Sequence, residues 1–272
     1  MQLTDATPVI PVFLINLKRS PERLAAMNVR CQRQGIAFTR IEAIDGRCDA
    51  LPGWLAGQFD GTQLSPGEVG CYASHLLAMG ALLNGDAPAC VVLEDDVILA
   101  PDFMQTVREA ISAAPKGWDI IHLSTNFKSA VSRVARLPRN SSIVAYTRLP
   151  TGAGAYIINR AGAQKLLKPQ QRTRPIDMEF RYGWVHDLTL YGVKPAPADQ
   201  ESGALTVSTI EARGTPQRSR WNPGILSCVY GFLLSRYRLG VVGNVTTMFT
   251  PPVRRGRNKM NVALVLHKTE GK

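Results

Sequence analysis

The stretch Cys90-Val91-Val92-Leu93-Glu94-Asp95-Asp96-Val97-Ile98-Leu99 decides how the rest of the sequence is interpreted. Four apolar residues lead directly into three carboxylates, and apolar residues resume at once. A short run rich in β-branched residues is typical of a strand that is buried on both faces. Three ionised acids cannot remain unpaired in such a core, because removing a lone charge from water costs several kcal/mol. The acids are therefore expected at the end of the strand, in a cleft, beside a cation.

The spacing of the acids suggests which of them would bind that cation. Side chains alternate along an extended segment, so Glu94 and Asp96 share one face while Asp95 points away from it. Two carboxylates at a strand end suit a hard divalent ion that keeps some of its water and holds a substrate diphosphate. An acid-rich surface turn is the alternative, but such turns usually lack apolar residues so close on both sides. The pattern favours a metal site at Glu94 and Asp96.

The residues before this stretch predict a strand, a helix and a second strand. Residues 9–17 are mostly apolar, a helix is expected from Pro21 to about Gly35, and residues 38–44 alternate as a strand. This order indicates an open, mostly parallel α/β sheet, in which ligands bind beyond the carboxyl ends of the strands.

Four polar residues fall at that edge of the sheet: Asn16, Arg19, Arg23 and Asp45. Arginines there suit phosphates, and an acid suits ribose hydroxyls or the edge of a base. The sequence contains no GxGxxG and no GxxxxGK[ST], so neither a dinucleotide site nor a P-loop is supported.

A helix is predicted between Ser65 and Asn84, because Ser65 and Glu68 have the spacing of a capping box. His75 lies on this helix near the expected cleft, where it could orient a phosphate or a sugar hydroxyl. The alternative is that His75 is buried in the core and that Glu68 or Ser74 is its hydrogen-bond partner. Further along the chain, the sequence predicts a helix over 101–113, strands over 118–123, 155–158 and 193–198, and a hairpin or loop over 126–150.

Composition limits the class of protein. With 272 residues and 45% hydrophobic content, the chain can bury a sizeable core. Its five cysteines lack CxxC spacing, which indicates reduced thiols in a cytoplasmic protein, and Cys71 is expected to be a small buried hydrophobe. No signal peptide is expected, and no apolar stretch has the roughly 18–20 residues needed to span a bilayer.

The net charge of +11 is concentrated at one end of the chain. Residues 212–272 hold eleven of the 32 Lys and Arg and a single acid, which leaves the body, residues 1–211, with a net charge of +1. We expect a basic C-terminal segment in which apolar residues over 225–233 form an amphipathic helix. Such a helix can lie on an anionic membrane, although docking onto the core or a solvated tail are alternatives. Nucleic-acid binding is not expected, because the aromatic residues of this segment fall partly within the helix pattern.

Six motifs in order resemble those of glycosyltransferase family 25, which comprises lipooligosaccharide-biosynthesis galactosyltransferases and their collagen-modifying relatives. The resemblance spans roughly residues 9–200. The motifs are residues 12–19 with Arg23, residues 43–46, residues 67–75, Leu93-Glu94-Asp95-Asp96, residues 152–156 and Pro175-Ile176-Asp177.

The resemblance implies a GT-A-like single domain that uses a UDP-sugar and Mn²⁺ or another divalent cation. Carried onto this chain, the final acid, Asp96, coordinates the metal, and Glu94 approaches the ribose or a metal-bound water. This chain departs from a strict Asp-x-Asp motif, because its first acid is Glu. The implied nucleotide-sugar-binding residues are Asn16, Arg19, Arg23, Asp45, His75 and Glu94.

The implied reaction is transfer of a hexose, galactose by family, with inversion onto a glycan or glycolipid acceptor of lipopolysaccharide or a related surface glycan. We expect Asp177 to be the general base, with Glu179 and Asp187 as rivals and with a helix N-cap as the structural alternative for Asp177. The rival functions are a metal-dependent sugar nucleotidyltransferase and a catalytically inactive glycan-binding homologue. The expected location is the cytoplasm, at the inner face of the membrane.

Overall fold

The computed structural model describes residues 9–124, 131–146 and 149–201, all of which belong to one compact unit. The predicted boundary at residue 211, the basic segment 212–272 and its amphipathic helix lie outside the described residues. Within the described ranges, no helix is both long and apolar enough to cross a bilayer.

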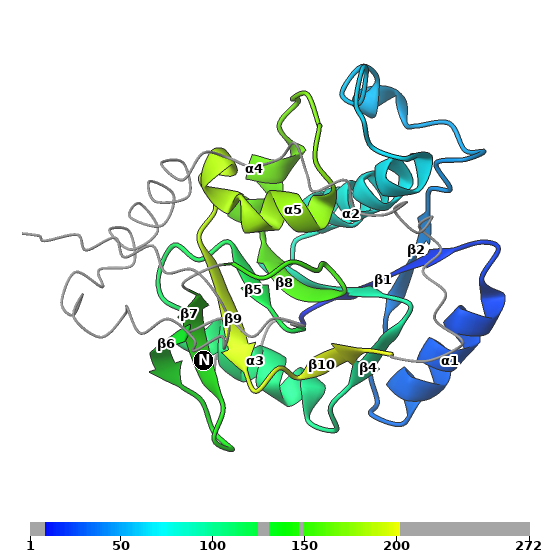
Figure 1. Ribbon diagram of the computed structural model, residues 1–272. Helices are drawn as coiled ribbons and strands as arrows, with labels where there is room; N and C mark the ends of the chain where they lie inside the picture. Colours follow the sequence, from blue (N-terminus) through cyan, green and yellow to red (C-terminus); the bar gives the residue numbers. More distant parts are fainter. Residues whose placement is uncertain (1–8, 125–130, 147–148, 202–272) are drawn as a thin grey trace, which may run out of the picture. The chain divides into compact units, whose positions relative to one another are not determined.

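The described elements alternate between strands and helices along most of the chain (Figure 1). The strands are β1 Val12–Leu17, β2 Thr39–Ala43, β3 Ala89–Glu94, β4 Val97–Leu99, β5 Ile120–His122, β6 Val131–Arg136, β7 Ser142–Tyr146, β8 Ala155–Asn159, β9 Leu190–Lys194 and β10 Ala198–Gln200. The helices are α1 Pro21–Gln32, α2 Pro66–Asn84, α3 Phe103–Ala113, α4 Arg160–Leu167 and α5 Ile176–Arg181, with short 3₁₀ turns η1 Gly53–Leu55 and η2 Gly183–His186.

The central sheet has eight strands in the order β2-β1-β3-β8-β5-β9-β7-β6. Six of them run in one direction, while β8 and β7 run in the opposite direction. The predicted α/β class with an open, mostly parallel sheet is therefore confirmed, and it is the GT-A-like arrangement that the resemblance implied. The expected hairpin within residues 126–150 is also present, as the antiparallel pair β6 and β7.

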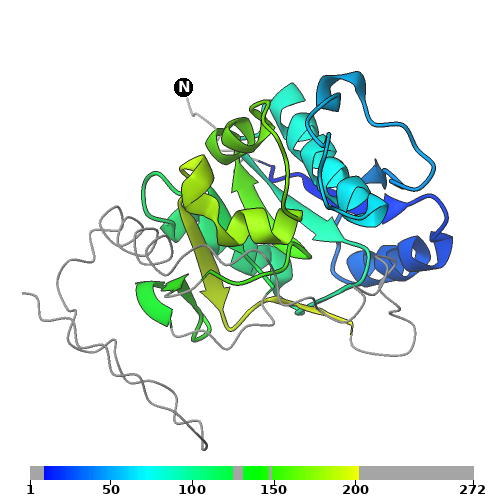
Figure 2. The same cartoon turned by 45° about the horizontal axis from the view of Figure 1, so that its top comes forward.

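Helices cover both faces of this sheet. In two views α2, α4 and α5 lie over one face, and α1 and α3 lie over the other (Figures 1 and 2). Side chains of β3 alternate accordingly: Cys90 and Val92 belong to the core cluster that includes Leu76 and Met79 of α2, whereas Leu93 is buried outside that cluster. The same alternation directs the acid at position 94 toward the α2 layer.

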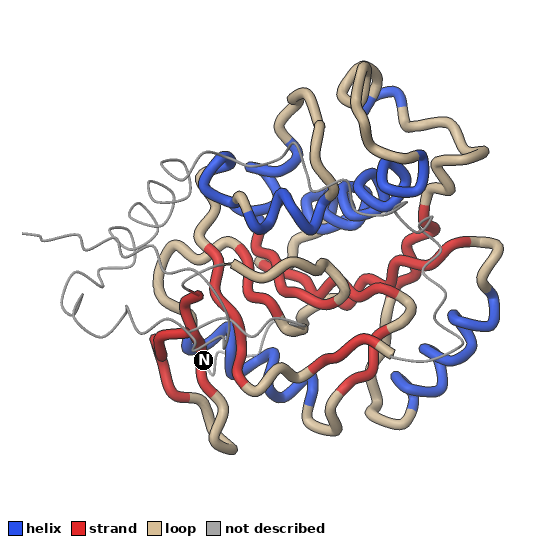
Figure 3. The backbone as a smooth tube through the Cα atoms, viewed as in Figure 1, coloured by secondary structure: helices blue, strands red, loops and turns tan. Residues whose placement is uncertain are grey.

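Two predicted strands are each divided in the structure (Figure 3). The stretch 90–99 is not one strand, because the chain turns at Asp95 and Asp96 and continues as β4, which pairs with β10 in a separate two-stranded sheet. The chain leaves the buried sheet where the charges begin, since a charged strand interior would lose its water. Residues 193–198 are likewise divided between β9 and β10, with prolines at 195 and 197 that cannot donate ladder hydrogen bonds.

Candidate active site

A cleft of about 340 Å³ opens at the carboxyl ends of β1, β2 and β3, the edge of the sheet that the sequence indicated. Its walls come from the β1–α1 turn, the end of β2, helix α2, the acids after β3 and the end of β10. The structure brings together every residue predicted for nucleotide-sugar and metal binding, since all of them line this cleft: Asn16, Arg19, Arg23, Asp45, His75, Glu94 and Asp96.

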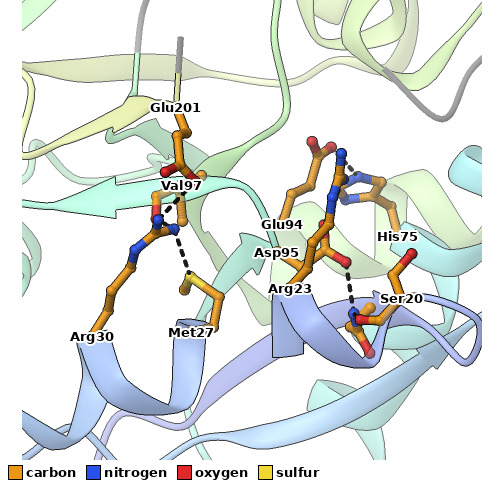
Figure 4. A network of polar contacts seen from close by, with 10 residues as sticks. Ser20, Arg23, Met27, Arg30, His75, Glu94, Asp95, Val97 and Glu201 are labelled. Atoms are coloured by element: carbon orange, nitrogen blue, oxygen red, sulfur yellow. Dashed lines mark hydrogen bonds and ion pairs between the residues drawn. The ribbon is translucent and has the colours of Figure 1, made fainter. Parts of the chain in front are cut away.

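The first two acids face opposite helix layers, as strand alternation requires. Glu94 meets α2, where its Oε1 lies 3.1 Å from Nε2 of His75. Asp95 meets α1, where its carboxylate accepts hydrogen bonds from Asn16 Nδ2 at 2.7 Å and Arg23 Nη1 at 3.1 Å. Figure 4 shows Arg23 and Asp95 beside Glu94 and His75. The sequence left Asp95 out of the site, yet it lines the cleft and fixes two of the predicted ligand-binding side chains.

One oxygen of the third acid lacks a hydrogen-bond partner among the described residues. Asp96 Oδ1 is buried without a hydrogen bond. Burial, followed by the neighbouring charges of Glu94 and Asp95, raises the pKa of Asp96 to about 6. A divalent cation would relieve this repulsion and supply the missing partner, so the oxygen donors at Glu94 and Asp96 fit a hard metal ion.

His75 is fully buried between a hydroxyl and a carboxylate. Its Nδ1 lies 3.0 Å from the Tyr156 hydroxyl, and its Nε2 faces Glu94. The alternative that Glu68 or Ser74 satisfies this histidine is wrong, because Glu68 caps α2 through the backbone N–H of residue 65, and Ser74 bonds to the main chain.

Close backbone contact holds α2 against the end of β2. A Cβ atom on Gly70 would lie 2.4 Å from the carbonyl oxygen of Ile44, and one on Gly46 would lie 1.9 Å from that of Pro66. Ser74 adds two hydrogen bonds, since its Oγ accepts from Ile44 N at 2.9 Å and donates to the Gly70 carbonyl at 2.6 Å. The glycines of residues 43–46 and 67–75 therefore position the wall that carries His75.

Ion pairs organise the rim of the cleft. Arg19 Nη1 lies 2.9 Å from Asp45 Oδ2, and the Arg19 side chain is 41% exposed. A second ion pair joins Arg30 to Glu201 at 2.7 Å, and Arg30 also donates to the Val97 carbonyl at 3.0 Å (Figure 4). Glu201 and Gln200 line the cleft although no sequence motif pointed to them, because they reach it only through the long-range pairing of β10 with β4.

The three candidate bases occupy different surroundings and do not line this cleft. Asp177 lies in the first turn of α5, where its Oδ1 accepts the Met178 N–H at 2.8 Å. Pro175, not Asp177, is the N-cap residue, so the alternative reading of Asp177 as an N-cap is wrong. Glu179 is buried in an ion pair with His186 at 2.6 Å. Asp187 has a left-handed backbone at the end of η2.

Cys71 lies on α2 one turn before His75 and lines the cleft, where it is only partly buried and not the fully buried hydrophobe that the sequence predicted. Desolvation, followed by the charges of Glu94 and Asp177, raises the pKa of the Cys71 thiol well above its ordinary value. The expectation that Cys71 is not a free nucleophile agrees with this protonated state. The effect of Asp177 on this thiol also indicates that α5 contributes charge near the α2 wall.

Comparison with known proteins gives one family for this architecture and cleft. The family model described as "Glycosyltransferase family 25 (LPS biosynthesis protein)" matches residues 9–180. Procollagen galactosyltransferase 1 of Danio rerio is 28% identical over 192 residues, which cover 64% of this chain and 31% of the relative. The inactive glycosyltransferase 25 family member 3 of Mus musculus is 30% identical over 217 residues, which cover 68% of this chain and 36% of that relative.

The chain spans about a third of the length of the curated relatives it matches. Among solved structures, a glycosyltransferase involved in glycosylation of the major capsid of PBCV-1 aligns with a TM-score of 0.43 and 10% identity, over 72% of this chain and 96% of that one. Mouse xyloside xylosyltransferase 1 aligns with a TM-score of 0.38 and 11% identity, over 66% of this chain and 83% of that one.

Proposed function

Because the chain belongs to glycosyltransferase family 25, we propose that it transfers a hexose, galactose in the first instance, from a UDP-sugar to a glycan acceptor. The acceptor would be a sugar of lipopolysaccharide or a related surface glycan, in keeping with the family description. The observation that carries the proposal is the cleft at the ends of β1, β2 and β3, in which two buried acceptor oxygens, Asn16 Oδ1 and Asp96 Oδ1, have no hydrogen-bond partner among the described residues.

The nucleotide would bind along the β1–α1 turn. The amide nitrogen of Asn16 is already engaged by Asp95 and by the Ser20 carbonyl at 3.0 Å, which leaves Asn16 Oδ1 to accept from a base N–H or a ribose hydroxyl. Asp45 can accept from the ribose, and Arg19 can turn from Asp45 to a diphosphate oxygen because its side chain is largely exposed. Arg23 would act mainly by holding Asp95 in place.

A divalent cation, Mn²⁺ in this proposal, would be held by Asp96 with help from Glu94, and it would supply Lewis-acid neutralisation of the diphosphate. The protein's own part is to keep Glu94 oriented through His75 and to exclude bulk water from a partly buried carboxylate pair. Asp95 remains paired with Arg23 and is the least available of the three acids.

Asp177 is our candidate for the general base although it lies outside the lining of the cleft, because it belongs to the Pro-Ile-Asp motif and lies on α5, which packs against α2. As the acceptor hydroxyl attacks the anomeric carbon, Asp177 takes the hydroxyl proton, the anomeric carbon–oxygen bond breaks, and UDP leaves with the bonding electrons. Attack from the face opposite the leaving group inverts the configuration. Glu179 is a weaker candidate because it is buried, with His186 Nε2 at 2.6 Å and Arg174 Nη1 at 3.6 Å from its carboxylate.

A donor screen tests the transferase activity directly. UDP release and product formation would be measured for a panel of UDP-hexoses with Mn²⁺, with EDTA, and with simple acceptor sugars. We expect turnover with a UDP-hexose, and loss of turnover when Asp177 is replaced by Asn. Failure of all UDP-hexoses, with or without metal, would contradict the proposal.

The Asp96→Asn substitution tests the metal site. We expect Mn²⁺ affinity to fall by at least about tenfold and metal-dependent turnover to fall with it, because the substitution removes the negative charge of the carboxylate ligand. Asp86→Asn, at the exposed end of α2, is the matched control and should behave as the wild type. Calorimetric Mn²⁺ titration and UDP release measure the two effects. Full activity after chelation with EDTA would remove the metal from the proposal.

A catalytically inactive binding protein is the second candidate, because several curated relatives are named as inactive members of the family. Calorimetry distinguishes it from an enzyme: such a protein would bind UDP-sugar or glycan without releasing UDP. We further propose a cytoplasmic location with peripheral contact, through residues 212–272, with an anionic membrane that carries a glycolipid acceptor.

A further inference from the structure

One wall of the cleft combines sulfur, nitrogen and oxygen donors in a way that the proposed transfer reaction does not require. Cys71 and His75 are separated by four positions on α2, so both side chains project from the same face of the helix. The third donor, Glu94, reaches this face from the end of β3. One ligand atom from each of the three residues lies within 4.8 Å of the other two.

We propose that Cys71, His75 and Glu94 form a Zn²⁺ site distinct from the Asp96 site, and that zinc bound there inhibits the enzyme by withdrawing Glu94 from the catalytic metal. A thiolate and an imidazole prefer Zn²⁺ to Mn²⁺, whereas a carboxylate pair suits Mn²⁺. Zinc bonds of 2.0–2.3 Å place tetrahedral ligand atoms roughly 3.3–3.8 Å apart, so side-chain rotations of modest size would close the site.

The surroundings of His75 are those of a metal ligand. The Tyr156 hydroxyl contacts Nδ1 at 3.0 Å, which fixes the ring and turns Nε2 toward Glu94 and the cleft. In most zinc-bound histidines, the ring nitrogen that does not bind the metal makes a hydrogen bond of this kind. The cleft itself leaves a fourth coordination position open to water or to a substrate oxygen.

The charges of the three ligands also match those of a divalent zinc ion. On binding, the S–H bond of Cys71 breaks, a sulfur–zinc bond forms, and the proton passes to the solvent. The resulting thiolate and the Glu94 carboxylate together neutralise one Zn²⁺ ion. The ion would therefore be buried as a neutral complex, which avoids most of the cost of burying a net charge.

Cobalt titration of the full-length protein tests the site without reference to catalysis. After removal of metals with EDTA and desalting, Co²⁺ should produce a thiolate-to-cobalt charge-transfer band in the wild type, and added Zn²⁺ should abolish that band. Cys48→Ser, which removes an exposed thiol, should retain the band, whereas Cys71→Ser should lose it. A band that persists in Cys71→Ser, or no band in the wild type, would overturn the proposal.

A second variant keeps the test decisive if Cys71→Ser does not fold. Tyr156→Phe retains all three ligands but removes the hydroxyl that orients His75, so it should bind Zn²⁺ about 10–100-fold more weakly, measured by competition with a zinc chelator. Wild-type zinc affinity in this variant would contradict the geometry proposed here.

The inhibitory effect rests on the proposed transferase function. In UDP-release assays with excess Mn²⁺, zinc should inhibit the wild type and Cys48→Ser, and the fractional inhibition should be lost in Cys71→Ser. A protein without transferase activity would still show the cobalt band, so failure of the function and failure of the zinc site give different results.

Discussion

Asp95 shows how one residue can serve the site without binding a ligand. Its carboxylate accepts from Asn16 on β1 and from Arg23 on α1, so it joins the strand to the helix beside the cleft. Side-chain exposures of 11% for Asp95 and 17% for Arg23 place this pair largely out of water. Removing one partner of such a pair leaves the other charge poorly solvated.

The arginines at positions 19 and 23 should therefore respond differently to alanine substitution. Arg23→Ala should lower the free energy of unfolding by about 1–3 kcal/mol, because Asp95 loses its cation. Arg19→Ala should change it by less than about 1 kcal/mol, because the Arg19 side chain is 41% exposed and water can replace it beside Asp45, but should weaken UDP-sugar binding by about 1–3 kcal/mol. Urea unfolding and calorimetry measure these quantities. Unchanged donor affinity in both variants would place the nucleotide elsewhere.

His122 gives the protein a defined sensitivity to acid. Both of its ring nitrogens are buried without a hydrogen-bond partner in the described part of the chain, between the rings of Tyr146 and Phe180, whose centroids lie 6.4 and 5.8 Å away. Burial lowers the pKa of His122 from 6.5 to about 4. The unfolded chain thus takes up a proton at a higher pH than the folded protein does. Stability from this residue is present above pH 6.5 and is lost as the pH falls from 6.5 toward 4.

His122→Phe should remove that dependence while keeping an aromatic ring against Phe180. Between pH 7.5 and pH 4.5 the wild type should lose about 2 kcal/mol more unfolding free energy than the variant. Urea unfolding at the two pH values gives the difference. Parallel losses in the two proteins would mean that His122 is solvated or hydrogen-bonded in solution.

At the scale of the elements, the seating of α2 on β2 determines the shape of the cleft. The helix carries His75, and its approach to residues 44–46 depends on glycines at positions 46 and 70. Gly80 lies further along the same helix, where an added Cβ would meet nothing within 4 Å. Gly70 and Gly80, which both lie on α2, therefore form a matched pair for mutagenesis.

Gly70→Ala should destabilise the fold by about 2 kcal/mol or more and weaken donor binding, because the new methyl group would overlap backbone atoms of residues 44 and 46. Gly80→Ala should stabilise the protein by about 0.5–1 kcal/mol through helix propensity alone. Thermal and urea unfolding compare the two variants. Equal effects would show that α2 can shift without cost.

The elements near the start of the chain were predictable because their signals are local. Apolar runs, the Ser65 capping box and the acids after a buried strand identified β1, α2, β3 and the edge that holds the cleft. Alternation also predicted that Asp95 faces away from Glu94. It could not predict that Arg23 would stand opposite Asp95, since that depends on how α1 packs.

The other residues at the cleft could not be predicted from the sequence, because their positions depend on pairing between distant strands. Tyr156 reaches His75 because β8 lies antiparallel to β3 with Val92 opposite Tyr156, a register that no local pattern encodes. Gln200 and Glu201 reach the cleft through the pairing of β10 with β4. The division of the 90–99 stretch follows from the same long-range pairing.

At the scale of the whole molecule, the uneven charge remains the main clue to location. Residues 212–272 carry a net charge of +10 and the body carries +1. Each Lys or Arg near an anionic surface contributes about 1 kcal/mol, and salt screens the attraction over roughly 8–10 Å. We therefore expect salt-sensitive binding to anionic vesicles that is lost when the chain is truncated after Arg213.

Co-sedimentation with anionic and neutral vesicles at low and high salt measures this binding. Transfer to a soluble acceptor sugar should survive the truncation, because every described residue that lines the cleft lies at or before position 201. Equal partitioning of the full-length and truncated proteins would exclude a membrane role for the segment.

The ion pair between Arg30 and Glu201 has a consequence for how an acceptor would be found. Glu201 is held at the rim of the cleft, so the segment that follows it starts at the entrance of the site. Ten residues, 202–211, separate it from the basic segment, which sets a contour length of at most roughly 40 Å. With that segment on a membrane, the cleft is tethered within this radius of the lipid surface. The search for a glycolipid acceptor would then be confined to the membrane plane, at an effective concentration set by the length of the tether.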